Sequence, residues 1–195
     1  MAIRIAERRD VEAMRQIYAP YITDTAYSYE YEVPSYEEFL HRFETITAHD
    51  PWLVWEEDGK VLGYVYGEPA YVRKAYGFLA DLAIYLHPDA QGKGVGRKLY
   101  AVCEEILKRQ GYCLVYGVVT SANPQSCQFH LALGYREAAR FQKSGMKFNA
   151  WHDTIWYEKQ LNPQPEGGLE QFPVSWKTLH LADLLPHTIE EEVDR

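Results

Sequence analysis

Apolar side chains recur at helical spacing in two stretches near the start of the chain. Asp10 stands directly before the first stretch, residues 11–18, and Ser35 directly before the second, residues 36–48. Asp and Ser are residue types that cap helices, and Glu38 has the spacing from Ser35 of a capping box. The pattern therefore predicts two helices in the N-terminal quarter.

Alternating or continuous apolar runs predict strands around and after these helices. Asp58-Gly59 is a strong hairpin signal, and a run that is apolar throughout suits a strand buried on both faces. The predicted strands lie at residues 3–7, within 52–68 on both sides of Asp58-Gly59, and at 78–86, 113–119, 135–143 and 150–161. Helices are predicted at 96–111 and after Asn123-Pro124. This order indicates an α/β (α+β) domain over residues 1–161, followed by a linker and appendage over 162–195.

Composition narrows the class of protein. The chain has 195 residues, which suits one domain, and a formal net charge of −8, which disfavours nucleic acid or an anionic membrane as partner. Its three cysteines have no metal-binding spacing, and no His, Cys and carboxylate cluster does either, so no metal is expected. The N-terminus is too charged for a signal peptide, and no apolar run has membrane-spanning length. We expect a cytoplasmic protein.

Three alternate glycines, Gly92, Gly94 and Gly96, precede the helix predicted at 96–111. No Gly-Lys is followed by Ser or Thr, which excludes a P-loop, and Arg97 occupies the third glycine position of a dinucleotide fingerprint. Backbone amides of such a loop, at the positive end of a helix, can bind a pyrophosphate. Lys93 and neighbouring basic side chains could screen further phosphate charge. The alternative is a plain glycine-rich turn that caps a helix.

Two motifs together carry a family resemblance. Gln91-x-x-Gly94-x-Gly96, followed downstream by Asn123-x-x-Ser126 and "LGY" at 133–135, resembles the GCN5-related N-acetyltransferases (GNAT). The resemblance implies a mixed, mostly antiparallel sheet of about seven strands, flanked by about four helices and splayed between strands 4 and 5. It also implies acetyl-coenzyme A as co-substrate. The implied binding residues are Ile84, Tyr85 and Leu86, then Gln91, Gly92, Lys93, Gly94, Val95, Gly96 and Arg97, and finally Asn123 and Ser126.

The segments "DTAYSYEYEVP", "PAYVRKAYGF" and "GMKFNAWHDTIWYEKQL" are similar to the phosphinothricin and methionine-sulfone branch of that family. The resemblance implies a homodimer that acetylates the amino group of a small amino acid or analogue. Arg73 could pair with the acceptor's carboxylate. Its pocket could be walled by Tyr27, Tyr29 or Tyr31, and by Tyr76 and Trp151. Other acceptors stay open, namely a polyamine, an aminoglycoside or a protein N-terminus, and so does a catalytically silent acyl-coenzyme A sensor.

Acetyl transfer to an amine needs a group that takes the amine's proton and a group that manages the leaving thiolate. Asp81 is the only ionisable residue in the apolar run 78–86, so burial should raise its pKa and make it a better base. The branch usually has Glu at this position, so the shorter Asp81 could act directly or through a water molecule. His130 falls where relatives place a proton-carrying side chain near the sulfur. The alternatives are a structural Asp81 with a polar partner and a His130 that is satisfied in the core.

The last segment contains a short amphipathic stretch with Trp176, Leu179, Leu181 and Leu185. We expect it to pack on the surface of the domain or on a partner subunit, where it could contribute to a dimer contact. The alternative is a loosely ordered tail.

Overall fold

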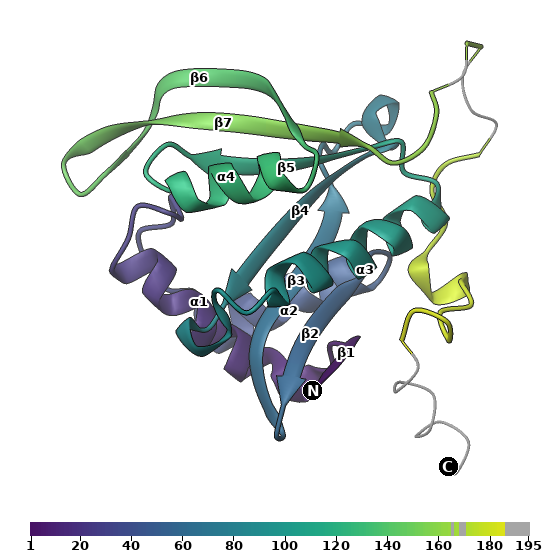
Figure 1. The fold of residues 1–195 in the computed structure, drawn as a ribbon, viewed down its shortest axis with the longest axis horizontal. Helices are drawn as coiled ribbons and strands as arrows, with labels where there is room; N and C mark the ends of the chain where they lie inside the picture. The colour runs from purple at the N-terminus through teal and green to yellow at the C-terminus, as the bar shows by residue number, and fades with distance from the viewer. Residues whose placement is uncertain (165, 168–170, 186–195) are drawn as a thin grey trace.

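Seven β-strands form one sheet, in the order β1-β2-β3-β4-β5-β7-β6, in the computed structural model (Figure 1). The structure describes residues 1–164, 166–167 and 171–185. All neighbouring strands are antiparallel except β4 and β5, which are parallel. The strands are β1 (Ala2–Ile5), β2 (Trp52–Glu57), β3 (Lys60–Pro69), β4 (Leu79–Leu86), β5 (Leu114–Thr120), β6 (Arg136–Lys147) and β7 (Ala150–Gln160). The predicted mixed, mostly antiparallel sheet is confirmed.

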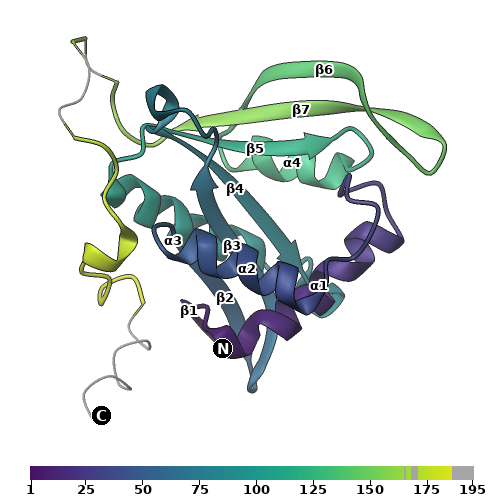
Figure 2. The same cartoon turned by 180° about the vertical axis from the view of Figure 1, so that it is seen from behind.

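Four α-helices in the described part of the chain cover the sheet on two sides. They are α1 (Val11–Thr23), α2 (Tyr36–Thr47), α3 (Val95–Gln110) and α4 (Pro124–Ala132). Helices α3 and α4 lie on one face (Figure 1), and α1 and α2 lie on the opposite face (Figure 2). Each side has its own buried core. Leu99, Ile106 and Leu107 of α3 belong to the first, and Met14 of α1 and Phe39 of α2 belong to the second.

Local signals in the sequence account for several element boundaries. Asp58 and Gly59 have φ angles of 50° and 74°, so they form the tight β2–β3 turn that their residue types predict. The Ser35 hydroxyl accepts the Glu38 N–H at 3.2 Å, and the Glu38 carboxylate accepts the Ser35 N–H at 2.7 Å, which confirms the capping box before α2.

The prediction for Asp10 is wrong in its mechanism. Asp10 directly precedes α1, but its carboxylate makes no capping hydrogen bond to that helix. It accepts two hydrogen bonds from Arg4, at 2.7 and 2.8 Å, and one from the Glu7 N–H at 2.8 Å. The Asp10 carboxylate therefore pairs with Arg4 on β1 and does not cap α1. A hydrogen bond from a cation stabilises a buried carboxylate more than one from a backbone amide does.

The β6–β7 hairpin extends beyond the helices at one end of the sheet (Figure 1). Large apolar side chains are exposed along it, together with three on the loop between β3 and β4. These side chains are Tyr71, Val72 and Tyr76 of the loop, and Phe141, Met146, Phe148 and Trp151 of the hairpin. An apolar surface of this kind is typical of an interaction face.

The described part of the C-terminal tail lies against α3 and packs on the chain's own core. The Val174 N–H donates to the Gln110 carbonyl at 2.9 Å, and the Trp176 indole N–H to the Thr47 carbonyl at 3.1 Å. Arg109 of α3 forms two hydrogen bonds with Asp183. Side chains from the tail that join the core under α3 are Trp176, Leu179, Leu181, Leu184 and Leu185. Residues 165, 168–170 and 186–195 of the predicted appendage lie outside the described residues.

No helix in the described ranges combines the length and apolar character needed to cross a bilayer. The three cysteines are free thiols. Within the same ranges, no three His, Cys, Asp or Glu side chains gather as ligands for a metal ion.

Candidate active site

The sheet opens between its two parallel strands. Strand β4 pairs with β5 only over residues 79–81, opposite residues 114–116. The rest of β4, residues 82–86, stays paired with β3 on its other edge but has no partner on β5. One edge of a buried strand therefore carries free backbone groups in the middle of the molecule.

Backbone alternation decides which amides point into this opening. The His87 N–H donates to the Leu62 carbonyl, so odd-numbered residues here direct their amides at β3. The even-numbered Ile84 and Leu86 direct theirs into the opening. Of the three amides predicted to hold a ligand, that of Tyr85 is therefore turned toward β3.

Two side chains close the end of the opening at Leu86. The Tyr21 hydroxyl of α1 donates to the Leu86 carbonyl at 2.8 Å and accepts the Leu86 N–H at 3.1 Å. The Gln91 amide lies 3.3 Å from the same carbonyl. Gln91 thus joins the glycine loop to the end of β4, whereas Tyr21 has no signal in the sequence beyond its place on a helix.

The glycine loop has the conformation that close approach of a ligand requires. Gly92 and Gly94 have φ angles of 70° and 78°, and no other heavy atom lies within 4 Å of where their Cβ atoms would be. Gly94 directly precedes α3, whose N-terminus has no side-chain cap. The first amides of α3, from Val95 to Arg97, are therefore available to an anion. The side chains of Lys93 and Arg97 are exposed beside them.

Asn123 and Ser126 lie at the start of α4, across the opening from β4. The Asn123 side-chain oxygen accepts the Ser126 N–H at 3.0 Å and so caps the helix. Both residues also line the opening. Asn123 can both cap the helix and contact a ligand, because the cap uses its side-chain oxygen and not its NH2 group.

Two adjoining cavities run through the opening. One, of about 140 Å³, reaches the glycine loop at Gln91 and Gly96. The other, of about 210 Å³, contains Asp81 and His130. Their walls share Tyr21, Tyr27, Ile84, Asn123 and Ser126, so they form one groove from the start of α3 to the point where β4 and β5 part.

Asp81 lies at the inner end of the groove, where β4 and β5 part. Its carboxylate accepts the Leu82 N–H at 2.8 Å. Burial raises the pKa of Asp81 to about 7, and the negative charge of Glu68 contributes in the same direction. A carboxyl group that titrates near neutrality can take and return a proton. The structure thus places an ionisable base candidate at the inner end of the groove.

His130 is buried on the α3–α4 side of the same cavity, with 3% of its surface exposed. Its Nδ1 lies 2.8 Å from the Ser126 carbonyl, which can only accept, so Nδ1 carries the proton. Nε2 then accepts from the Tyr100 hydroxyl at 2.9 Å. Burial lowers the pKa of His130. His130 is therefore neutral and fully hydrogen-bonded, and it reaches the cavity beside Tyr100.

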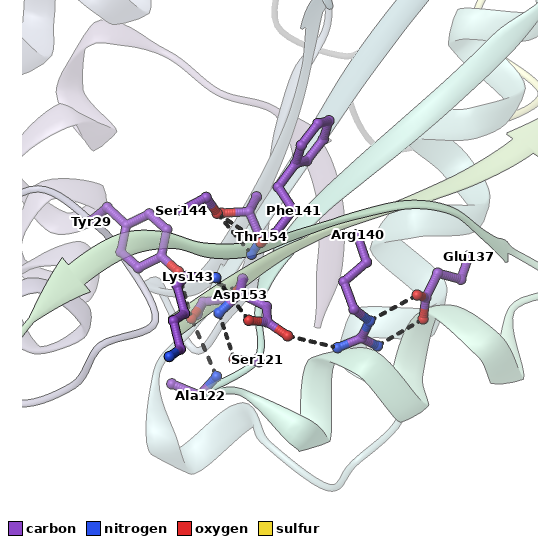
Figure 3. Close-up of polar contacts among 11 residues, drawn as sticks. Tyr29, Ser121, Ala122, Glu137, Arg140, Phe141, Lys143, Ser144, Asp153 and Thr154 are labelled. Carbon is purple, nitrogen blue, oxygen red and sulfur yellow. Dashed lines mark hydrogen bonds and ion pairs between the residues drawn. The ribbon is translucent and has the colours of Figure 1, made fainter. Parts of the chain in front are cut away.

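Tyr29 joins the loop after α1 to the β6–β7 hairpin (Figure 3). Its hydroxyl donates to the Thr120 hydroxyl at 3.1 Å and to the Asp153 carbonyl at 3.3 Å. Its ring occupies the space that a side chain at Gly145 would need. Nearby, the Lys147 ammonium donates to the carbonyls of residues 28 and 30 at 2.7 Å. These contacts fix the loop that carries Tyr27 into the cavity wall.

The other predicted acceptor residues are not brought to the cavity. Arg73 and Tyr76 lie on the exposed loop between β3 and β4, where Tyr76 contacts Tyr71 with ring centres 4.7 Å apart. Trp151 is 63% exposed near the turn of the β6–β7 hairpin. Neither these three residues nor Tyr29 lines either cavity of the groove.

Tyr27, Glu68 and Tyr100 also line the cavity, and of these only Tyr27 was expected from the sequence. Tyr27 belongs to the tyrosine-rich segment after α1, whose tyrosines were candidates for the pocket wall. Glu68 is set opposite Asp81 by the pairing of β3 with β4, and Tyr100 faces the cavity from α3. Only the three-dimensional arrangement identifies the last two.

Comparison with known proteins agrees with this geometry. Residues 3–156 match the model of the acetyltransferase (GNAT) domain family. The chain is 36% identical over 165 residues to a phosphinothricin N-acetyltransferase of Alcaligenes faecalis, covering 82% of each chain. It is 32% identical over 170 residues to an L-amino acid N-acyltransferase of Escherichia coli, covering 85% of this chain and 97% of the other.

Solved structures give the same result. A phosphinothricin acetyltransferase from Sinorhizobium meliloti in complex with acetyl-coenzyme A superposes with a TM-score of 0.80 and 32% identity, over 88% of this chain and 92% of the other. A putative acetyltransferase from Salmonella typhimurium with its cofactor acetyl-coenzyme A gives a TM-score of 0.81 and 29% identity, over 85% and 96%. The predicted resemblance is confirmed: the chain belongs to the GNAT acetyltransferase family.

Proposed function

We propose that this protein transfers the acetyl group of acetyl-coenzyme A to the amino group of a small amino acid or amino-acid analogue. The observation that carries the proposal is the groove, which joins an anion-binding helix start to a carboxyl group that titrates near pH 7. The similarity to phosphinothricin and L-amino acid acetyltransferases supports the class of acceptor.

The residues of the groove fit acetyl-coenzyme A. The uncapped start of α3 offers amides for its pyrophosphate, and the positive φ angles at Gly92 and Gly94 keep side chains away from that approach. The side chains of Asn123 and Ser126 can meet the polar groups of its pantetheine arm, whereas the Leu86 amide already donates to the Tyr21 hydroxyl. Bound there, acetyl-coenzyme A supplies an acetyl group activated as a thioester.

The chain's own groups serve the proton transfers. Asp81 takes a proton from the acceptor's ammonium group, which leaves the amine lone pair free to attack. The opening-facing amide of Ile84 can stabilise negative charge on the thioester oxygen, because a backbone donor held in place needs no reorganisation. The Tyr100 hydroxyl, hydrogen-bonded to His130, faces the same cavity from α3.

A panel of acceptors tests the proposal. Purified protein is mixed with acetyl-coenzyme A, and thiol release is followed with phosphinothricin, methionine sulfone, methionine sulfoximine, spermine, an aminoglycoside and a peptide with a free N-terminus. We expect turnover with the amino-acid analogues. Activity on spermine alone would contradict the proposed acceptor, and binding of acetyl-coenzyme A without turnover on any amine would indicate a sensor.

We also propose that the protein is a homodimer that uses the exposed apolar side chains of its β6–β7 hairpin. Support comes from the apolar residues of that face, including Phe148 and Trp151. The tail is a weaker candidate for the contact because its apolar residues already pack on the chain's own core. Sedimentation of Phe148→Asp should then show a monomer, and an unchanged dimer would exclude this face.

A further inference from the structure

Glu68 lies directly opposite Asp81 in the sheet. The two residues are register partners where β3 pairs with β4. Side chains on either side of Asp81 in β4, Ala80 and Leu82, pack in the core under α3, so Asp81 faces the α1–α2 side. Register partners in a sheet share a face, and both carboxylates line the 210 Å³ cavity.

Neither carboxylate has a counter-ion among the residues that the structure describes. Asp81 accepts one backbone hydrogen bond, from Leu82, and Glu68 has no hydrogen-bond or ion-pair partner in those residues. The cation that acts on Glu68 is Arg42, whose guanidinium is already bonded to Glu30 at 3.0 Å. Two like charges are thus placed side by side in a half-buried site, which destabilises a sheet unless a ligand compensates.

Burial raises the pKa of Glu68 as well as that of Asp81. The tyrosine and histidine side chains that face the pair carry no charge near pH 7. Burial raises the pKa values of Tyr66, Tyr85, Tyr100 and Tyr116 and lowers that of His130, so all of these are neutral there. Tyr21 is also kept neutral by burial, Tyr27 lines the same cavity, and Asp50 acts on Glu68 only as a further negative charge.

We propose that Glu68 and Asp81 form a two-carboxylate acceptor, which binds the ammonium group of the amine substrate and takes its proton. The proposal rests on the proposed function and names a second catalytic residue for it. An ammonium N–H bond breaks, a carboxyl O–H bond forms, and the freed lone pair attacks the thioester carbon. The carbon–sulfur bond then breaks, and the electron pair leaves with sulfur as thiolate, which takes the second proton that the nitrogen loses as the amide forms.

The pair explains how Asp81 can act despite its short side chain. Glu68 adds a carboxylate on a longer side chain from the neighbouring strand, aimed into the same cavity. Its charge also makes Asp81 a stronger base, because the like charge favours the protonated form. After the transfer the two carboxylates share one proton, so that the pair keeps a single negative charge.

Steady-state kinetics of Glu68→Gln test the pair. We expect kcat/KM for the amine to fall about 10- to 100-fold, and its acid limb to move to lower pH, because Asp81 loses the neighbour that raises its pKa. Glu68→Asp keeps the charge, so it should restore most of the rate and the original limb. Glu57→Gln removes the same charge at the other end of the β2–β3 hairpin and should match the parent.

A measurement without substrate separates this inference from the proposed function. Carboxyl ¹³C NMR of the free protein should show that Glu68→Gln lowers the pKa of Asp81 and leaves its fold intact. If that shift appears but no amino acid is acetylated, the pair stands and the acceptor class is wrong. If the parent acetylates amino acids while Glu68→Gln keeps its rate within about threefold and its acid limb unmoved, the inference is wrong.

Discussion

Buried carboxylates in this protein fall into two groups with opposite surroundings. In the scaffold, Asp10 is bonded twice to Arg4, Asp50 accepts from the Tyr112 hydroxyl at 2.8 Å, and Glu104 from the Lys159 ammonium at 2.6 Å. In the groove, Asp81 has one backbone donor. Glu68 has none among the described residues.

The difference separates stability from chemistry. A buried carboxylate with a full set of donors stays ionised and holds elements together, as Asp10 holds β1 to the start of α1. A buried carboxylate without donors is costly, and proteins keep such groups where a proton must move. The four predictions that follow test this division, from the largest expected effect to the smallest.

Asp81→Asn should produce the largest effect, on catalysis. Removal of a general base typically costs about 100- to 10,000-fold, so kcat should fall on that scale. Affinity for acetyl-coenzyme A should stay nearly unchanged, because Asp81 lies at the far end of the groove from the glycine loop. Stopped assays at saturating substrates and calorimetry measure the two quantities. A kcat within about threefold of the parent would exclude Asp81 as the base.

Asp10→Asn should lower the stability of the protein and leave its kcat unchanged. The substitution leaves the Arg4 guanidinium, which is largely buried, without one of its two carboxylate partners. Breaking such a pair costs about 3 kcal/mol, so urea unfolding should show a loss of that size. The kcat of the folded variant should equal that of the parent. A large loss of kcat at a temperature where the variant is folded would contradict the proposed division between scaffold and catalytic carboxylates.

The pH dependence of stability should differ between the parent and Asp81→Asn. The folded-state pKa of Asp81 is about 7, above its ordinary value of 3.8, so the folded state holds this proton more tightly. The resulting stabilisation is present below about pH 4 and is lost as the pH rises to about 7. Between pH 5 and pH 8 the parent should therefore lose about 2 kcal/mol more than Asp81→Asn in its free energy of unfolding.

Urea titrations of both proteins at the two pH values measure this difference. Parallel losses in the two proteins would show that Asp81 is not the group responsible. Asp10→Asn serves as the control, because its partner Arg4 stays charged at both pH values.

Glu104→Gln should have the smallest effect. Its partners are the Tyr135 hydroxyl and the Lys159 ammonium, whose side chain is 29% exposed. Partly exposed ion pairs contribute about 1 kcal/mol or less, and Gln can still accept from Tyr135. Thermal unfolding should therefore shift by a few degrees at most, with kcat unchanged. A shift as large as that of Asp10→Asn would show that exposure of the partner is unimportant.

Local chemistry made much of the fold predictable from the sequence. The Asp58-Gly59 turn, the Ser35–Glu38 cap and the glycine loop depend on residues close together in the chain, and each forms as predicted. The opening between β4 and β5 followed from the family resemblance, and the short pairing over residues 79–81 agrees with it.

The candidate site was predictable only in part, because its remaining contacts join distant segments. The pairing of Glu68 with Asp81 depends on how the loop between β3 and β4 sets the register, which no local pattern encodes. The Tyr21 contact with Leu86 joins residues 65 positions apart. The same loop carries Arg73 and Tyr76 away from the cavity, although the sequence places them only a few residues before Asp81.

The ring of Phe172 in the tail stacks on the ring of Phe78, the residue directly before β4, with ring centres 4.7 Å apart. A Cβ at Gly77 would meet the Phe172 ring at 2.9 Å, although the φ angle of −63° at Gly77 suits any residue. The Phe172 ring of the tail, together with the Lys74 carbonyl oxygen at 3.1 Å, therefore leaves little room for a side chain at position 77. Among homologues the two positions should vary together: lineages that lose the aromatic ring at 172 become free to accept alanine or serine at 77.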